Sequence, residues 1–238
     1  IQNISIFEDY TVGDFERDAI VKLDALYEKS EFAVMAGGSG LYIDAVLKGF
    51  DDFPAIDPSI REKLVAKYEM YGIEYLQNEL ERLDPVHYEK VAKENPQRMM
   101  RALEVSIGSG RPYSSFLNIK KNSRKFSPII IGLDAEREVM YERINHRVDI
   151  MVENGLIEEA RLLYPHKKLN ALQTVGYREL FSYFDGELTK EFAIEEIKKN
   201  TRRFAKRQMT WFKRTEGAAW FHFTTPAVDI IKFIEEKL

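Results

Sequence analysis

A glycine-rich turn directly follows an apolar run early in this chain of 238 residues. The run at 32–36 (Phe-Ala-Val-Met-Ala) is typical of a buried strand, and a helical pattern begins at about Leu41. Between them, the turn at 37–40 (Gly-Gly-Ser-Gly) would leave backbone N–H groups free at a helix N-terminus, which favours an anion such as phosphate beside the Ser39 hydroxyl. In the alternative interpretation, the glycines only make a tight turn and Ser39 caps the helix.

Two arginines four positions apart, Arg143 and Arg147, share one face of an expected helix. A guanidinium group donates paired hydrogen bonds, a geometry that fits phosphate oxygens. From the pattern alone, a solvated basic face near Glu142 and Asp149 is the simpler explanation.

A second polar set consists of Arg61, Gln97, Arg98 and Arg101. Arg98 and Arg101 are three positions apart and therefore share a helix face. A glutamine amide pairs with a base edge, and an arginine binds phosphate or stacks on a base, so RNA is a suitable partner. Ordinary surface charge is the alternative.

The strongest positive charge lies between Ile197 and Thr215, a stretch with eight Lys and Arg residues and no acidic residue. Solvated helix faces usually mix signs, so this stretch favours contact with a polyanion such as an RNA backbone. The cations assigned to that contact are Lys199, Arg202, Arg203, Lys206 and Arg207.

Composition excludes several classes of protein. The chain has no cysteine, which rules out disulfides, thiolate zinc sites and cysteine nucleophiles. Its four histidines are scattered without ligand spacing, so we expect no metal site built from them. It shows no apolar run long enough to span a bilayer and no signal peptide, and we expect a cytoplasmic protein that does not bind membranes.

Three Asp-Pro or Asn-Pro pairs mark helix starts, because each places an N-cap residue before a proline at the first helical position. They are Asp57-Pro58, Asp84-Pro85 and Asn95-Pro96. Residues 57–118 are therefore predicted to be nearly all helix.

Buried strands at 32–36, 127–133 and 219–223 alternate with helices over the rest of the chain, which predicts an α/β fold with a parallel sheet. We expect residues 1–54 and 119–238 to form this core and residues 55–118 to form an inserted all-helical subdomain. So few strands make a thin sheet, and we expect the core to be incomplete at the N-terminus.

Seven segments carry a resemblance over nearly the whole chain. They lie at 15–19, 37–42, 57–61, 95–104, 143–149 with Gly155, 175–179 and 205–211. In this order and spacing they resemble the tRNA dimethylallyltransferases, also called tRNA isopentenyltransferases. The resemblance implies a P-loop-kinase-like α/β core with a helical insertion that contacts the anticodon loop.

The resemblance also implies an activity. Members of that family use Mg²⁺ and transfer the dimethylallyl group of dimethylallyl diphosphate to the exocyclic amine of the adenosine just 3′ of the anticodon. It implies that Arg147 binds the diphosphate with Arg143 as a helper, and that Ser39, where the family more often has Thr, lies near the reacting groups. Ser39 and Arg147 are thus the expected catalytic residues, in a protein expected to be a monomer.

The expected partner is the tRNA anticodon stem-loop. Besides the cations between 197 and 215, the resemblance assigns to tRNA the residues Ser39, Arg61, Gln97, Arg98, Arg101, Gln173, Gly176, Tyr177 and Arg178. Gly176 is expected to allow close backbone approach. For Tyr177, a half-buried structural role is the alternative.

One departure from the family pattern affects the expected activity. The family begins with a Walker A phosphate loop and a catalytic Asp, and no G-x-x-x-x-G-K-[ST] occurs in this chain. We therefore expect the Mg²⁺ ligands to come mainly from a segment before Ile1 and from the diphosphate, and the chain as given to be inactive. An adenylate isopentenyltransferase and a non-catalytic RNA-binding fragment are the competing interpretations.

Overall fold

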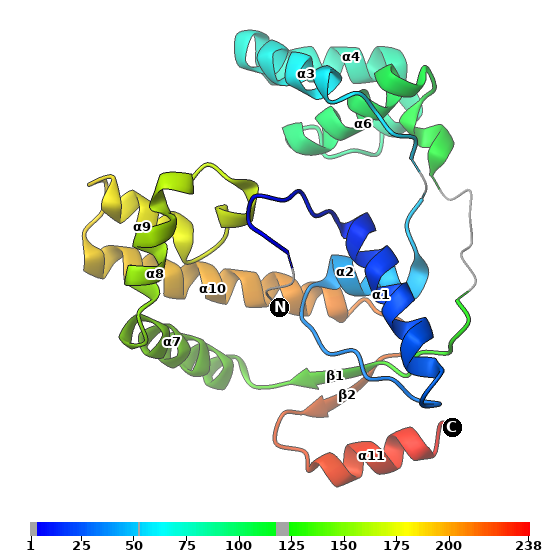
Figure 1. The fold of residues 1–238 in the computed structure, drawn as a ribbon, viewed down its shortest axis with the longest axis vertical. Coiled ribbons are helices and arrows are strands. Elements are labelled where there is room, and N and C mark those ends of the chain that lie inside the picture. Colours follow the sequence, from blue (N-terminus) through cyan, green and yellow to red (C-terminus); the bar gives the residue numbers. More distant parts are fainter. Residues whose placement is uncertain (1–3, 52, 118–123) are drawn as a thin grey trace. The chain divides into compact units, whose positions relative to one another are not determined.

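A computed structural model describes residues 4–51, 53–117 and 124–238 (Figure 1). The chain divides into two compact units. The core unit comprises Ile1–Leu47 and Lys125–Leu238, and the insertion unit is Lys48–Arg124. These limits lie a few residues outside the 55–118 range expected for the insertion.

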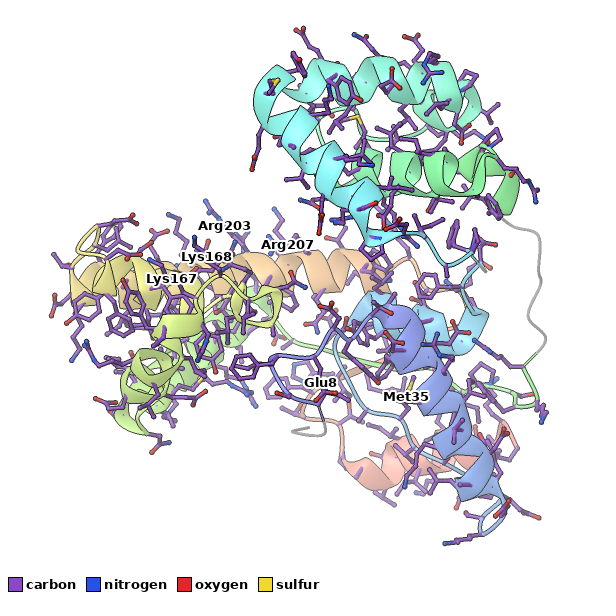
Figure 2. All side chains as sticks on the ribbon, turned by 45° about the horizontal axis from the view of Figure 1, so that its top comes forward. Glu8, Met35, Lys167, Lys168, Arg203 and Arg207 are labelled. Atoms are coloured by element: carbon purple, nitrogen blue, oxygen red, sulfur yellow. The ribbon has the colours of Figure 1, made fainter. Side chains whose placement is uncertain are left out.

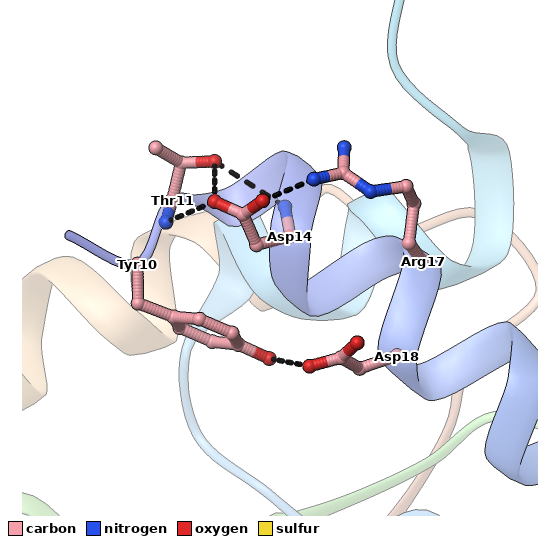
Figure 3. A network of polar contacts seen from close by, with 5 residues as sticks. All are labelled: Tyr10, Thr11, Asp14, Arg17 and Asp18. Carbon is pink, nitrogen blue, oxygen red and sulfur yellow. Dashed lines mark hydrogen bonds and ion pairs between the residues drawn. The ribbon is translucent and has the colours of Figure 1, made fainter. Parts of the chain in front are cut away.

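The first helix of the core unit, α1 (Val12–Tyr27), begins at a network of polar side chains that Figure 3 shows. The Thr11 hydroxyl accepts a hydrogen bond from the Asp14 N–H, and the Asp14 carboxylate accepts one from the Thr11 N–H at 2.8 Å. Arg17 pairs with the same carboxylate, and the Tyr10 hydroxyl donates to Asp18 at 2.8 Å. This capping box satisfies two of the N–H groups that a helix start leaves free.

The pKa values of two groups in this network are shifted in opposite directions. Burial and the hydrogen bond to Asp18 raise the pKa of Tyr10 to about 12. Hydrogen bonds from Thr11 lower the pKa of Asp14, because they stabilise its charged form. The start of α1 is therefore best satisfied with the Asp14 carboxylate ionised.

The strand expected at 32–36 is wrong. These residues form no strand, and the side chains of Phe32 and Val34 are 57% and 94% exposed. A strand forms only when a neighbouring strand pairs with its backbone, and in the described part of the chain the sheet contains only two strands, both from later in the sequence. An apolar run can indicate a strand, but it cannot supply the partner.

The sheet pairs β1 (Ile131–Asp134) with β2 (Ala219–His222) in parallel, and the register aligns Gly132 with Trp220. The parallel pair expected from the later strands is therefore confirmed. A Cβ atom at Gly132 would overlap the Trp220 ring, so glycine is needed where this indole covers the strand.

Helices form the long connection between the two strands. They are α7 (Arg137–Glu153), α8 (Leu156–Leu163), α9 (Tyr177–Phe184) and α10 (Lys190–Phe212), with short 3₁₀ turns η2 (Tyr164–His166) and η3 (Asn170–Leu172) after α8. Figure 1 shows α10 as the longest of them, and α7 and α9 both contact it. Their shared apolar core consists of Val148, Leu156, Ile157, Ala160, Leu172, Leu180, Phe181 and Ile197. The other helices of this unit are α2 (Gly40–Lys48) and α11 (Ala227–Glu235).

The described residues of the insertion unit fold as helices, as predicted. The unit contains α3 (Pro58–Tyr71), α4 (Ile73–Leu83), α5 (Pro85–Tyr88), α6 (Pro96–Ser109) and η1 (Tyr113–Phe116). All three predicted N-caps are confirmed, since the side chains of Asp57, Asp84 and Asn95 each accept a hydrogen bond from a backbone N–H in the first turn. Its core consists of Leu64, Leu76, Leu80, Met99, Met100, Ala102 and Leu103.

Asp84 has a second structural role beyond its cap. It is fully buried, and its carboxylate accepts hydrogen bonds from the His87 N–H at 3.0 Å, the Ser114 N–H at 2.6 Å and the Ser114 hydroxyl at 2.7 Å. These bonds tie the start of α5 to η1 and satisfy a charge that would otherwise be costly to bury.

A search of the described residues for a membrane-spanning segment gives a negative result. Their helices all lack the combination of length and apolar character that a bilayer crossing requires.

Candidate active site

A cavity of about 350 Å³ lies at the carboxyl end of β1, the edge of a parallel sheet where ligands commonly bind. It combines two arginines with an apolar wall. The lining residues are Leu133, Asp134 and Ala135 at the end of β1, Met140, Arg143, Ile144 and Arg147 of α7, Met209 of α10, and Phe223 after β2. A cavity with cationic and apolar sides suits a ligand with an anionic head and an apolar tail.

The four-residue spacing of Arg143 and Arg147 brings both side chains to this one cavity. The Arg143 guanidinium lies 5.0 Å from the centre of the Phe223 ring, a cation–π contact that holds it in place. Arg147 is exposed and makes no ion pair with any residue that the structure describes. Its charge is therefore available to an anion.

Asp134 is the acidic residue of the cavity wall, and both of its oxygens are engaged. Its Oδ1 accepts a hydrogen bond from the Ala135 N–H at 2.8 Å, and its Oδ2 lies 3.3 Å from the Lys213 Nζ. Sequence reasoning counted Lys213 in the positive stretch but gave it no role. Its pairing with Asp134 joins segments far apart in the chain, so no local pattern could reveal it.

Two glycines of the turn at 37–40, Gly38 and Gly40, are explained by close packing against α10. A Cβ atom at Gly38 would overlap the Gln208 side chain, whose Nε2 donates to the Gly38 carbonyl at 2.6 Å. A Cβ atom at Gly40 would overlap the Trp211 ring, and the Trp211 Nε1–H donates to Asp44 at 2.9 Å. The C-terminal end of α10 therefore packs against this turn.

Ser39 is exposed in this turn, directly before the first residue of α2. Its carbonyl accepts the hydrogen bond from the Ile43 N–H at 3.0 Å that opens the helix. Ser39 is not among the residues that line the cavity with Arg143 and Arg147. Its role beside a reacting group stays a prediction.

Several cations of α10 face other parts of the core unit. The Arg202 guanidinium donates to the Asn145 Oδ1 of α7 at 2.5 Å. The Lys198 Nζ lies 2.8 Å from Asp149, which also belongs to α7. Arg202 was predicted to bind tRNA, and its position against α7 gives it a structural contact as well. Lys199, also predicted to bind tRNA, pairs with Glu196 at 2.7 Å on its own helix.

Among the cations that α10 carries after Ile197, the exposed ones are Arg203, Lys206 and Arg207. Figure 2 labels Arg203 and Arg207 on this helix, together with Lys167 and Lys168 of the segment after α8. Sequence reasoning did not single out those two lysines. Lys167 pairs with Asp185 at 2.5 Å, so part of its charge is already neutralised.

The segment before α9 is held by its own side chains. Gly176 has a φ of +104°, and its N–H donates to Glu179 at 2.8 Å, while Asn200 donates to the other oxygen of Glu179 at 2.8 Å. A Cβ atom at Gly176 would meet no described atom within 4 Å, so the positive φ is what requires glycine within this chain. The close approach to tRNA expected there stays a prediction. The Gln173 amide donates to the Lys167 carbonyl at 2.5 Å.

Tyr177 is half-buried, as its structural alternative predicted. Its hydroxyl donates to Glu159, and its ring stacks on Phe181 with an interplanar angle of 14°. Burial and the hydrogen bond to Glu159 raise the pKa of Tyr177 to about 12. Arg178 beside it is exposed, and its contact with tRNA stays a prediction.

The insertion unit brings three predicted RNA contacts together around one acid, Glu104. The Arg61 Nη1 lies 3.1 Å from the Glu104 Oε2, and the Arg101 Nη1 lies 3.3 Å from its Oε1. The Arg61 Nη2 donates to the Gln97 Oε1 at 2.9 Å. Arg98 stays apart from this group with an exposed side chain. Glu104 was missed as an organiser, although its place three residues after Arg101 was a usable signal.

Comparison with known protein families gives a match over most of the chain. The family described as "IPP transferase" matches residues 1–215. A protein of Flavobacterium johnsoniae named "tRNA dimethylallyltransferase" is 62% identical over 244 residues, which cover 100% of this chain and 79% of that protein. A protein of Christiangramia forsetii with the same name is 57% identical over 238 residues, with 100% and 79% covered.

Solved structures give the same relationship at the level of the fold. The tRNA isopentenylpyrophosphate transferase of Bacillus halodurans is 35% identical, with a TM-score of 0.67 over 100% of this chain and 77% of that one. A eukaryotic dimethylallyltransferase acting on tRNA has a TM-score of 0.78 at 22% identity, over 99% of this chain and 65% of that one, and so supports the fold alone. An α/β core with an inserted set of helices is therefore confirmed.

Proposed function

Because this chain belongs to the IPP transferase family, we propose that it transfers the dimethylallyl group of dimethylallyl diphosphate to the exocyclic amine of an adenosine in tRNA. Prenyl transfer to tRNA is the activity of the named relatives and of the family to which this chain belongs, and the expected inactivity of the chain as given stays a prediction. We further propose that dimethylallyl diphosphate is the donor and that the adenosine just 3′ of the anticodon is the acceptor. We also propose which residues bind the donor and which bind the tRNA.

The reaction displaces a diphosphate from a primary allylic carbon. The amine nitrogen forms the new bond to this carbon, the carbon–oxygen bond breaks, the diphosphate leaves with the electron pair, and the amine loses a proton. Negative charge grows on the leaving oxygens, where cationic donors lower the barrier most. The two arginines of the cavity, Arg143 and Arg147, are placed to neutralise this charge.

The apolar wall of the same cavity suits the prenyl group. Leu133, Met209 and Phe223 face the space that the arginines line. An apolar surface beside the reacting carbon excludes water, which would otherwise compete with the amine for the allylic group. The joint presence of cationic and apolar lining is the observation on which the assignment of the donor rests.

Magnesium is the metal that the resemblance implies for the diphosphate. The described residues contain no group of three or more His, Cys, Asp or Glu that could hold a metal ion, and both oxygens of Asp134 are engaged. These residues do not fit a Mg²⁺ site made by protein ligands alone. We propose that the oxygens of the diphosphate are the main ligands.

The insertion unit and the cationic face of α10 favour tRNA over a free nucleotide as acceptor. An adenylate isopentenyltransferase needs neither the group around Glu104 nor the exposed cations Arg203, Lys206 and Arg207 to hold a mononucleotide. Replacing the anticodon stem-loop RNA with adenosine monophosphate in a transfer assay separates the two acceptors. We expect one protein molecule for each RNA, which light scattering of the complex checks.

The test of the proposed function is Arg147→Ala in the complete protein. Loss of a donor to the developing charge is expected to lower kcat/KM for dimethylallyl diphosphate by roughly 10²-fold, while the Kd for the RNA changes little. Prenyl transfer is followed with labelled donor, and RNA binding is measured separately.

Arg137→Ala is the matched control, because Arg137 lies in the first turn of the same helix and does not line the cavity. It is expected to leave both quantities nearly unchanged. Equal losses of transfer and RNA binding in Arg147→Ala, or equal losses in the two variants, would argue against a diphosphate site here.

A further inference from the structure

We propose that Arg61 is a positioning residue for RNA recognition. Its guanidinium fixes the Gln97 side chain so that the amide N–H₂ group, and not the amide oxygen, is presented to the RNA. This inference rests on the proposed function, because it takes the insertion unit as the part of the protein that meets the anticodon loop.

The orientation of the Gln97 amide follows from the chemistry of its partner. The Arg61 Nη2 lies 2.9 Å from the Gln97 Oε1. A guanidinium group has only donors, so an amide that bonds to it must turn its oxygen towards it. The N–H₂ group of Gln97 then points away from Arg61. Gln97 is exposed and lies in the first turn of α6.

Arg61 is itself held in place by an ion pair. Its Nη1 lies 3.1 Å from Glu104, whose side chain is only 12% exposed, whereas that of Arg61 is 43% exposed. The second oxygen of Glu104 binds Arg101 at 3.3 Å. Glu104 is largely shielded from solvent and forms ion pairs with two arginines. It therefore holds Arg61 of α3 against α6, and Arg61 in turn holds the Gln97 side chain.

A fixed amide selects the kind of atom that it recognises. Reading adenine with a glutamine amide requires the oxygen as acceptor as well as the nitrogen as donor. Here one of the two lone pairs of the oxygen accepts a bond from Arg61, and this bond turns the oxygen towards α3, so the N–H₂ group is the part offered to RNA. Its partner is an acceptor atom, a ring nitrogen or a carbonyl oxygen, on a base that the loop leaves unpaired. Fixing the amide beforehand also reduces the side-chain entropy lost on binding.

The test is a double-mutant cycle of Arg61→Met and Gln97→Ala in the complete protein, with anticodon stem-loop RNA as the ligand. If Arg61 acts through Gln97, Arg61→Met weakens binding about 3–10-fold when Gln97 is present and less than about 1.5-fold when it is absent. The dependence of log K on log salt concentration is unchanged in Arg61→Met, because the variant still binds the same phosphates.

Arg98→Met serves as the matched control. Arg98 is an exposed cation next to Gln97 and makes no ion pair with the described residues. If it contacts phosphate, its removal weakens binding by the same factor with or without Gln97 and lowers the salt slope by about 0.7–0.9. Thermal unfolding of each variant separates a folding defect from a binding defect.

Two results overturn the inference. One is an equal loss of affinity on Arg61→Met with and without Gln97, and the other is a lower salt slope in Arg61→Met, which would mean that Arg61 itself touches a phosphate. Either result in a protein that still binds and prenylates RNA leaves the proposed function intact. Absence of both RNA binding and prenyl transfer in the unaltered complete protein would instead overturn the proposed function.

Discussion

At the scale of single residues, Glu104 has the widest effect on the candidate RNA-binding surface. Its carboxylate contacts two guanidinium groups that belong to α3 and α6. Without it, Arg61 and Arg101 would repel each other at the short separation that the helices impose. A partly shielded acid can thus raise the density of positive charge that a surface carries.

Glu104→Gln is expected to destabilise the insertion unit. The change removes the negative charge shared by two arginines, and we expect a loss of about 1 kcal/mol in the free energy of unfolding. Glu79→Gln is the control, since Glu79 forms an exposed i,i+3 pair with Arg82 in the same unit and such pairs contribute about 0–0.5 kcal/mol. Denaturant unfolding measures both; equal losses would show that Glu104 has no special role.

At the scale of elements, α10 has two functionally different sides. One side packs against α7 through Arg202 and Lys198, and the other exposes Arg203, Lys206 and Arg207. A charge count along the sequence treats all of these cations alike. The structure separates those that hold helices together from those that are free to meet phosphate.

The two sides of α10 are expected to respond differently to substitution. Replacing Arg203, Lys206 and Arg207 with alanine should weaken binding to RNAs of any sequence and lower the salt slope by about 0.7–0.9 for each phosphate that the variant no longer binds. Arg202→Met should instead lower thermal stability and leave the slope unchanged. A filter-binding series at several salt concentrations checks this, and the same slope in the triple variant as in the unaltered protein would remove this face from the interface.

The elements that the sequence predicted well are those whose signals are local. Asp57, Asp84 and Asn95 indicate helix starts because each cap side chain and the backbone N–H that donates to it lie within three residues of one another. The run at 32–36 failed as a strand because strand formation depends on a distant partner. The contact between Gly38 and Gln208 was also beyond local patterns, so the packing of the turn against α10 could not be predicted, and anion binding at this turn stays a prediction.

In the candidate site, too, local signals were predicted from the sequence and contacts between distant segments were not. A four-residue helical spacing was enough to place Arg143 and Arg147 on one face, and the cavity confirms that they meet. Nothing in the spacing could indicate that Phe223 lies beneath Arg143 or that Asp134 is paired with Lys213. Those contacts depend on the register of the parallel strands and on where α10 ends.

At the scale of the whole molecule, the described residues form two hydrophobic cores, one in each unit. Each unit buries its own apolar side chains, so each has its own free energy of unfolding. A change in conditions that acts on one unit can therefore lower its stability without an equal effect on the other.

Acid is expected to destabilise the insertion unit. Burial lowers the pKa of His87 below its ordinary value of 6.5, so the unfolded state binds a proton more readily than the folded state. The stability that depends on neutral His87 is complete above about pH 6.5 and is lost as the pH falls through the lowered folded pKa.

Calorimetry between pH 7.5 and pH 5 should show a falling melting temperature for the insertion unit. His87→Gln should reduce this fall, because the insertion unit of the variant contains no histidine. A His87→Gln variant with the same pH dependence as the unaltered protein would contradict the assignment.

Because Trp211 packs against the turn at 37–40, its fluorescence can report on the conformation of that turn. The chain has two tryptophans, and this one lies over Gly40 and donates to Asp44, whereas Trp220 belongs to β2. Indole fluorescence depends on the polarity and hydrogen bonding around the ring. A ligand that moves the glycine turn would therefore change the emission of Trp211, and Trp220→Phe would leave that signal without background from the sheet.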